Sequence, residues 1–177
     1  MSIARVRALV VVGALFVSAV VLVTMAVLRD TQTVAQARAT GCPPGQVPAD
    51  LRLPEEKNIK INVLNGTRQA GLAEQVAEDF QNREFVVVKP PSTDRKGVNG
   101  VAVLRYGPKA VGAAHVLRAY FLNQAEPQFD IKRTSDVVDV VVGNRYRQLG
   151  TITEVNQSIG ALGKPQLPKG TCDAYPR

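Results

Sequence analysis

Residues 59–89 read IKINVLNGTRQAGLAEQVAEDFQNREFVVVK, and this stretch decides the fold. Apolar and polar residues alternate over residues 59–63, which is the period of a half-buried strand. After the Asn65-Gly66 turn, the pattern changes to that of a helix closed by Asn82. The expected buried stripe of this helix is Leu72, Ala73, Val76, Ala77 and Phe80. Residues 85–89 then predict a second strand, ended by two prolines.

The same plan is repeated further along the chain. Residues 101–106 predict a strand, and Pro108 favours the start of a second helix, because proline suits the first helical position. The expected buried stripe of this helix is Ala110, Ala114, Leu117 and Phe121. The repeat indicates two stacked strand-helix units.

Two further strands are expected at residues 129–133 and 137–142. The short polar link between them predicts an antiparallel hairpin. The order βαββαββ is most simply satisfied by one sheet with both helices on one face. The predicted fold class is therefore α/β, an α+β two-layer arrangement of the ferredoxin-like type.

The N-terminal part has a different composition. Residues 8–28 contain no charged side chain and would form a helix of about 31 Å, which matches a bilayer core of roughly 30 Å. Basic residues precede this segment, so it is predicted to span the plasma membrane with residues 1–7 in the cytoplasm. The chain that follows the segment is then extracytoplasmic. A cleaved secretory signal is the competing interpretation, although its apolar region is usually shorter.

Outside this predicted transmembrane helix, the chain divides into three parts. Residues 29–57 lack strand or helix periodicity and predict an extracytoplasmic tether, and residues 58–147 form the predicted α/β domain. Residues 148–177 predict an irregular tail, in which residues 153–162 have a weak helical pattern. Cys42 and Cys172 are expected to form a disulfide that returns this tail to the domain. A redox-active pair is disfavoured, because the Cys-x-x-Cys spacing is lacking.

The most specific constellation lies where the first strand meets the first helix. The amides of a helix N-terminus, together with a nearby arginine, can hold a phosphate or carboxylate. The candidate ligand-binding residues are Asn65, Gly66, Thr67, Arg68 and Gly71. A structural interpretation is favoured over binding: Gly66 would allow a tight turn, and Gly71 would allow the helix to pack closely on the sheet.

The sequence offers few groups for catalysis. The only histidine, His115, falls about 140° around the helix from Ala110 and is predicted to lie on the solvated surface. The sequence has no esterase elbow, zinc-protease helix or metal-spaced cysteine cluster. The acidic pairs Glu55-Glu56, Glu78-Asp79 and Asp136 with Asp139 are typical of solvated turns and helix faces. No catalytic residue, metal or cofactor is therefore predicted.

Residues 61–67, INVLNGT, followed by Gly71-Leu72-Ala73, resemble the opening of the LytR C-terminal domain family. Residues 139–144, DVVVGN, resemble its closing strand, although the acidic residue that often follows the glycine is not found here. In that family the domain often trails a glycopolymer-transferring domain, for which this chain has no space. The resemblance implies a non-enzymatic role in cell envelope integrity, as in single-domain, membrane-anchored members from actinobacteria.

Two functions remain open from the sequence. The first is a module that binds a cell-wall glycopolymer or an envelope-assembly protein through the Asn65 turn, the exposed sheet face, or both. Residues 31–177 carry 19 basic and 14 acidic side chains, a formal charge of +5 that suits anionic partners. The second is an enzyme on an envelope polymer that uses Arg68 and a carboxylate such as Asp139. Nucleic-acid binding is disfavoured, because the strands lack RNA-binding aromatic patterns.

Overall fold

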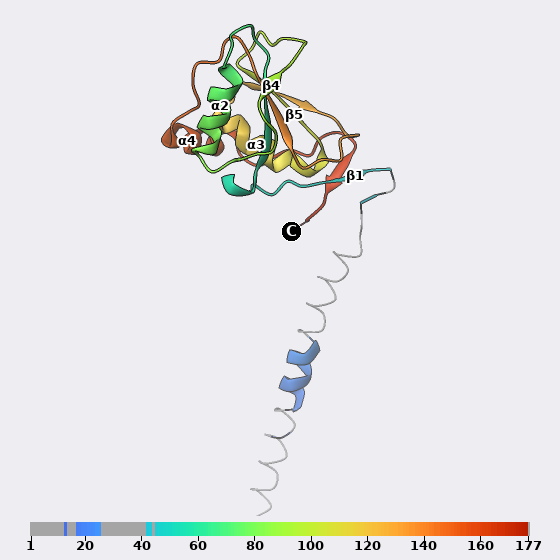
Figure 1. Ribbon diagram of the computed structural model, residues 1–177. Coiled ribbons are helices and arrows are strands. Elements are labelled where there is room, and N and C mark those ends of the chain that lie inside the picture. Colours follow the sequence, from blue (N-terminus) through green and yellow to red (C-terminus); the bar gives the residue numbers. More distant parts are fainter. Residues whose placement is uncertain (1–12, 14–16, 26–41, 44, 177) are drawn as a thin grey trace, which may run out of the picture. The chain divides into compact units, whose positions relative to one another are not determined.

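The computed structural model describes residues 13, 17–25, 42–43 and 45–176 (Figure 1). The chain forms two compact units, Met1–Gly41 and Cys42–Arg177. Residues 17–25 of the first unit are helical, whereas the predicted cytoplasmic residues 1–7, most of the predicted transmembrane helix at residues 8–28, and residues 29–41 of the predicted tether lie outside the described residues. Within the described part of the chain, no helix has the length and apolar character needed to cross a membrane.

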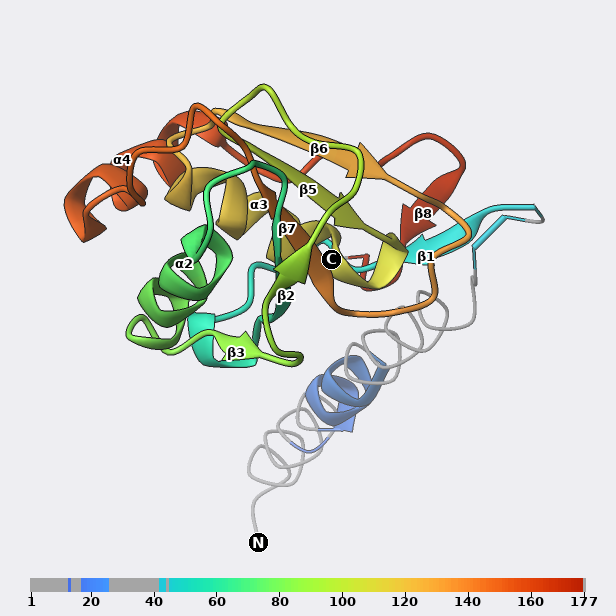
Figure 2. The same cartoon turned by 45° about the horizontal axis from the view of Figure 1, so that its top comes forward.

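The second unit is built on a mixed sheet (Figure 2). Its path has the strand order β3 (Val86–Val87), β2 (Lys60–Asn65), β7 (Val138–Val142), β5 (Ala102–Tyr106) and β6 (Ala125–Phe129). The short strand β4 (Ser92–Thr93) also pairs with β2. β2 runs parallel to β3 and β7, β5 runs parallel to β6, and β5 and β7 are antiparallel. β7 therefore joins two halves of opposite strand direction.

Each half is a strand, a helix and a neighbouring parallel strand. α2 (Leu72–Gln81) connects β2 with β3, and the single turn η2 (Pro108–Ala110) leads into α3 (Val111–Tyr120), which connects β5 with β6. Both predicted apolar stripes are confirmed, since every residue named in them is buried. The stripes of α2 and α3 share one core with the same side chains of the sheet, so both helices cover one face. The shared sheet residues are Ile61, Val63, Ala102, Leu104, Val138, Val140 and Val142.

The predicted hairpin and ferredoxin-like order are wrong. A ferredoxin-like sheet has split units, in which another strand separates the two that flank a helix. Here those two strands are neighbours, and β5 lies between β6 and β7. The strand predicted at residues 129–133 is β6, and it lies at Ala125–Phe129. It is a polar edge strand with Pro127 at its centre, which hides the usual alternation.

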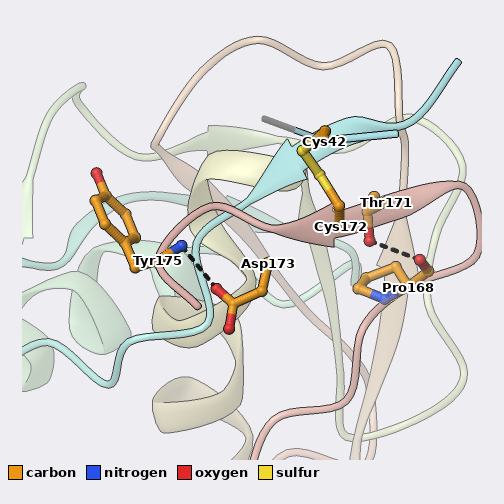
Figure 3. The surroundings of a disulfide bond; sticks show 6 residues. All are labelled: Cys42, Pro168, Thr171, Cys172, Asp173 and Tyr175. Carbon is orange, nitrogen blue, oxygen red and sulfur yellow. Dashed lines mark hydrogen bonds between the residues drawn. A yellow bond between two sulfur atoms is a disulfide. The ribbon is translucent and has the colours of Figure 1, made fainter. Parts of the chain in front are cut away.

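The two ends of the folded unit are fastened together (Figure 3). β1 (Val47–Ala49) pairs in parallel with β8 (Thr171–Asp173), and the predicted Cys42–Cys172 disulfide is confirmed, with Cα atoms 5.7 Å apart. We call β1, β8 and this disulfide the strap. The predicted tether is thus wrong for its described residues from Cys42 onward, because β1, the buried Ala49 and the turn η1 (Glu56–Asn58) belong to the folded unit.

The C-terminal segment is ordered, contrary to the predicted irregular tail. Helix α4 (Ile152–Leu162) begins with a capping box, in which Thr151 and Glu154 satisfy each other's backbone amides. α4 packs against α3 and covers His115, which is only 8% exposed. The prediction of a solvated histidine is therefore wrong, because α3 is buried on its α4 side as well as on its sheet side.

Candidate functional site

The predicted ligand-binding turn follows β2 and is closed by its own hydrogen bonds. Oδ1 of the buried Asn65 accepts from the Thr67 amide at 2.9 Å and from the Thr67 hydroxyl at 2.8 Å. Nδ2 of Asn65 donates to the Gln69 carbonyl at 2.6 Å. The Thr67 hydroxyl in turn accepts from the Gln69 amide at 3.0 Å. Asn65 and Thr67 therefore shape the turn, while Arg68 is exposed.

The two glycines of this turn have roles that are the reverse of those predicted. A Cβ on Gly66 would lie 2.8 Å from the Val142 carbonyl oxygen, so Gly66 is needed for close packing against β7. Gly71 has φ +76°, and a Cβ added there would meet open space, so Gly71 is needed for the left-handed conformation that precedes α2. Both glycines are thus required by the structure of the turn.

Backbone hydrogen bonds gather basic side chains around this turn. The Val98 amide donates to the Gly66 carbonyl at 2.8 Å, and the Asn144 amide donates to the Val98 carbonyl at 3.0 Å. The turn, the loop after β4 and the segment after β7 therefore meet at one edge of the sheet. We call the exposed cations of these three segments the basic rim: Arg68, Arg95, Lys96 and Arg145.

The basic rim carries charge that the fold does not neutralise. None of its four cations forms an ion pair with any other described residue. The rim lies beyond the carboxyl ends of the parallel strands β2 and β7, beside the N-terminus of α2. In open α/β sheets this is where ligands commonly bind, and the helix end adds partial positive charge. The arrangement suits an anion.

Asp94 fixes the loop that supplies two of these cations. Its amide donates to the Asn65 carbonyl at 2.8 Å, and its carboxylate accepts from the Lys96 amide and pairs with Arg105 on β5. The hydrogen bond from Arg105 is the main cause that lowers the pKa of the Asp94 carboxyl. Asp94, Arg105 and the rim residues other than Arg68 were missed by sequence reasoning, although a charged residue inside an apolar strand was a signal for Arg105.

The candidate residues of the enzymatic alternative are separated. Asp139 lies in β7 opposite Asn62, and the side-chain amide of Asn62 donates to the Asp139 carboxylate at 2.8 Å. The same carboxylate forms an ion pair with Arg133 at 2.8 Å. Arg68 follows Asn65, whose partner in the β2 and β7 pairing is Val142, three residues beyond Asp139. Asp139 therefore forms its ion pair with Arg133 within the sheet, whereas Arg68 lies beyond the carboxyl end of β2.

Asp136 and His115, two other titratable candidates, have structural contacts. Asp136 pairs with Lys60 at 2.9 Å, next to the strap. Nε2 of His115 lies 3.0 Å from the Gly163 carbonyl oxygen. Burial is the main cause that lowers the pKa of His115, so the neutral ring is favoured. These contacts fasten loops and α4 to the domain.

Comparison with known proteins identifies the family. No curated protein matches the chain. The fold is similar to that of the soluble domain of a conserved hypothetical secreted protein from Mycobacterium marinum, with a TM-score of 0.52 and 20% identity, over 68% of this chain and 82% of that one. The profile of the LytR_C family, described as LytR cell envelope-related transcriptional attenuator, matches residues 58–146. This match spans half of the sequence, and the chain belongs to the LytR_C family.

Proposed function

We propose that this protein is a membrane-anchored, non-catalytic module that binds an anionic cell-wall glycopolymer outside the cytoplasm and so supports envelope integrity. The family is related to the cell envelope, which fits this location. The Cys42–Cys172 disulfide supports an oxidising compartment. The long apolar segment at residues 8–28 supports attachment to the plasma membrane.

The basic rim is the observation that carries the proposal. Two arginines on or near the sheet are paired, Arg105 with Asp94 and Arg133 with Asp139. The rim cations are exposed, form no ion pair with a described residue, and lie on three segments that backbone hydrogen bonds join. A flexible polymer with repeated negative charges can contact several of them at once, which raises its overall affinity through multivalency.

The test is a charge-reversal experiment on the purified full chain. Affinity is measured for an isolated phosphate-containing wall glycopolymer and for a neutral wall glycan of similar length. Replacement of all four rim cations by glutamate should weaken binding of the anionic polymer roughly tenfold or more, and added salt should weaken wild-type binding. Binding of the neutral glycan should be weak and insensitive to both changes.

The matched control reverses four exposed lysines outside the rim, Lys109, Lys132, Lys164 and Lys169. This variant has the same net charge as the rim variant, so it separates a local site from a general electrostatic attraction. Equal losses in the two variants would show that only the overall charge matters. No binding of the anionic polymer by the wild-type chain would refute the proposal.

A further inference from the structure

A second surface lies between α2 and β3. It is an open groove of about 520 Å³ that runs along the exposed side of α2 and the chain that leaves β3. It is lined by Ala77 on the helix and, on the strand side, by Val87, Val88, Lys89, Pro90 and Pro91. Glu74 and Glu78 line its helix side. We call it the α2–β3 groove.

The strand side of this groove exposes apolar side chains. Val88, which lines the groove just after β3, is 47% exposed. The amides of Val86 and Val88 donate to the carbonyls of Ile59 and Ile61 in and beside β2. Because consecutive residues of a strand alternate, the amide and carbonyl of Val87 face the outer side. Pro90 and Pro91 follow directly, so the edge is too short to template a long strand.

The helix side of the groove carries an unbalanced charge. Glu74 and Glu78 are one helical turn apart and repel each other. Neither forms an ion pair with a described residue. All three charged residues of α2 are acidic, the third being Asp79. Lys89 is the one cation among the described lining residues and lies on the strand side, so the groove has an acidic helix side and a net charge of −1.

We propose that the α2–β3 groove binds a segment of a partner protein in which apolar residues are flanked by lysine or arginine. The apolar residues would cover Val88 and the prolines, and the cations would neutralise Glu74 and Glu78. An anionic polymer or lipid surface is repelled by the same two carboxylates. The groove therefore gives the module a protein-binding surface separate from the basic rim, and the inference does not depend on the polymer-binding proposal.

The test uses two short fluorescent peptides with the full-length protein. One peptide has leucines at its centre and lysines at both ends, and its twin has glutamates in place of the lysines. Fluorescence anisotropy should show binding of the lysine peptide alone. The double variant Glu74→Lys with Glu78→Lys should weaken this binding roughly tenfold or more and should now bind the glutamate peptide. Val88→Ser should weaken binding of the lysine peptide without reversing the charge preference.

The control variant carries Glu84→Lys and Glu126→Lys, which make the same change in net charge at exposed positions outside the groove lining. Its affinity for the lysine peptide should stay within about twofold of wild type. Circular dichroism confirms that each variant is folded before its binding is compared. An equal loss in both double variants, equal binding of the two peptides by the wild type, or no binding of the lysine peptide would overturn the proposal.

Discussion

The two ends of strand β2 differ in how their charges are used. At its start, next to the strap, Lys60 pairs with Asp136, and Arg52 pairs with Asp50 at 2.6 Å. At its end, the cations of the basic rim have no ion-pair partner within the described part of the chain. The difference supports the proposal that the rim end is the one that binds an anion.

The largest effect is expected at the strapped end. Replacing Cys42 and Cys172 by serine removes a cross-link that closes a loop of 130 residues. The chain-entropy model gives such a loop roughly 4 to 5 kcal/mol. Urea unfolding of the double variant should show a loss of this size, and reduction of the wild type should reproduce it. An unchanged unfolding midpoint in both cases would show that the strap holds without its covalent link.

A smaller loss of stability is expected at the rim end from Gly66→Ala. The added Cβ would lie 2.8 Å from the Val142 carbonyl oxygen, so the backbone must shift, at a cost of about 1 to 3 kcal/mol. In Gly71→Ala the added Cβ lies in open space, and the only penalty is the strain of a positive φ. The free energy of unfolding should therefore fall by roughly 1 kcal/mol. Chemical denaturation of the two variants checks this order, and the reverse order would contradict the assigned roles.

A modest pH dependence is expected from His115 beneath α4. Its pKa is lowered in the folded protein from the ordinary value of 6.5, so the unfolded chain binds the proton more readily. The stabilisation from the neutral ring is present above the unfolded pKa and is lost as the pH falls through and below about 6.5. Stability measured at pH 7 and pH 5 should therefore differ less in His115→Gln than in the wild type. An identical difference would exclude this histidine as a contributor.

The smallest effect on stability is expected from Arg68→Ala in the rim. Arg68 is exposed and forms no ion pair with a described residue, so its loss should change the free energy of unfolding by less than about 0.5 kcal/mol. Affinity for the anionic glycopolymer should nevertheless fall. A large loss of stability would show that Arg68 has a structural role, like the paired cations of the strapped end.

The sequence predicted the parts of the fold that depend on periodicity. Each residue of the stripes from Leu72 to Phe80 and from Ala110 to Phe121 is buried, because a helix covering one face of a sheet needs that spacing. Strand order depends instead on pairing between distant segments, which leaves little local signal. For this reason the position of β5 between β6 and β7 was not predicted, whereas the capping box at Thr151 is a local pattern that strengthens the weak helical signal of residues 153–162.

The candidate site was predicted less completely than the fold. Asn65, Gly66 and Arg68 were named as candidates because they follow a clear strand-to-helix transition. Arg95 and Arg145 join Arg68 only through hydrogen bonds between three loops that are far apart in sequence. No spacing rule connects such residues. The glycine roles were reversed for a related reason, because the approach of Val142 to Gly66 depends on the register of β7.

The position of β7 has a consequence for the order in which the protein can be completed. This strand comes last in the main sheet along the chain, yet it occupies the seam between the two strand-helix-strand halves. Until residues 138–142 have been synthesised, the facing sides of β2 and β5 have no strand to seal them. A nascent or truncated chain that stops before Val138 therefore presents two open edges, which are sites for aggregation or chaperone capture.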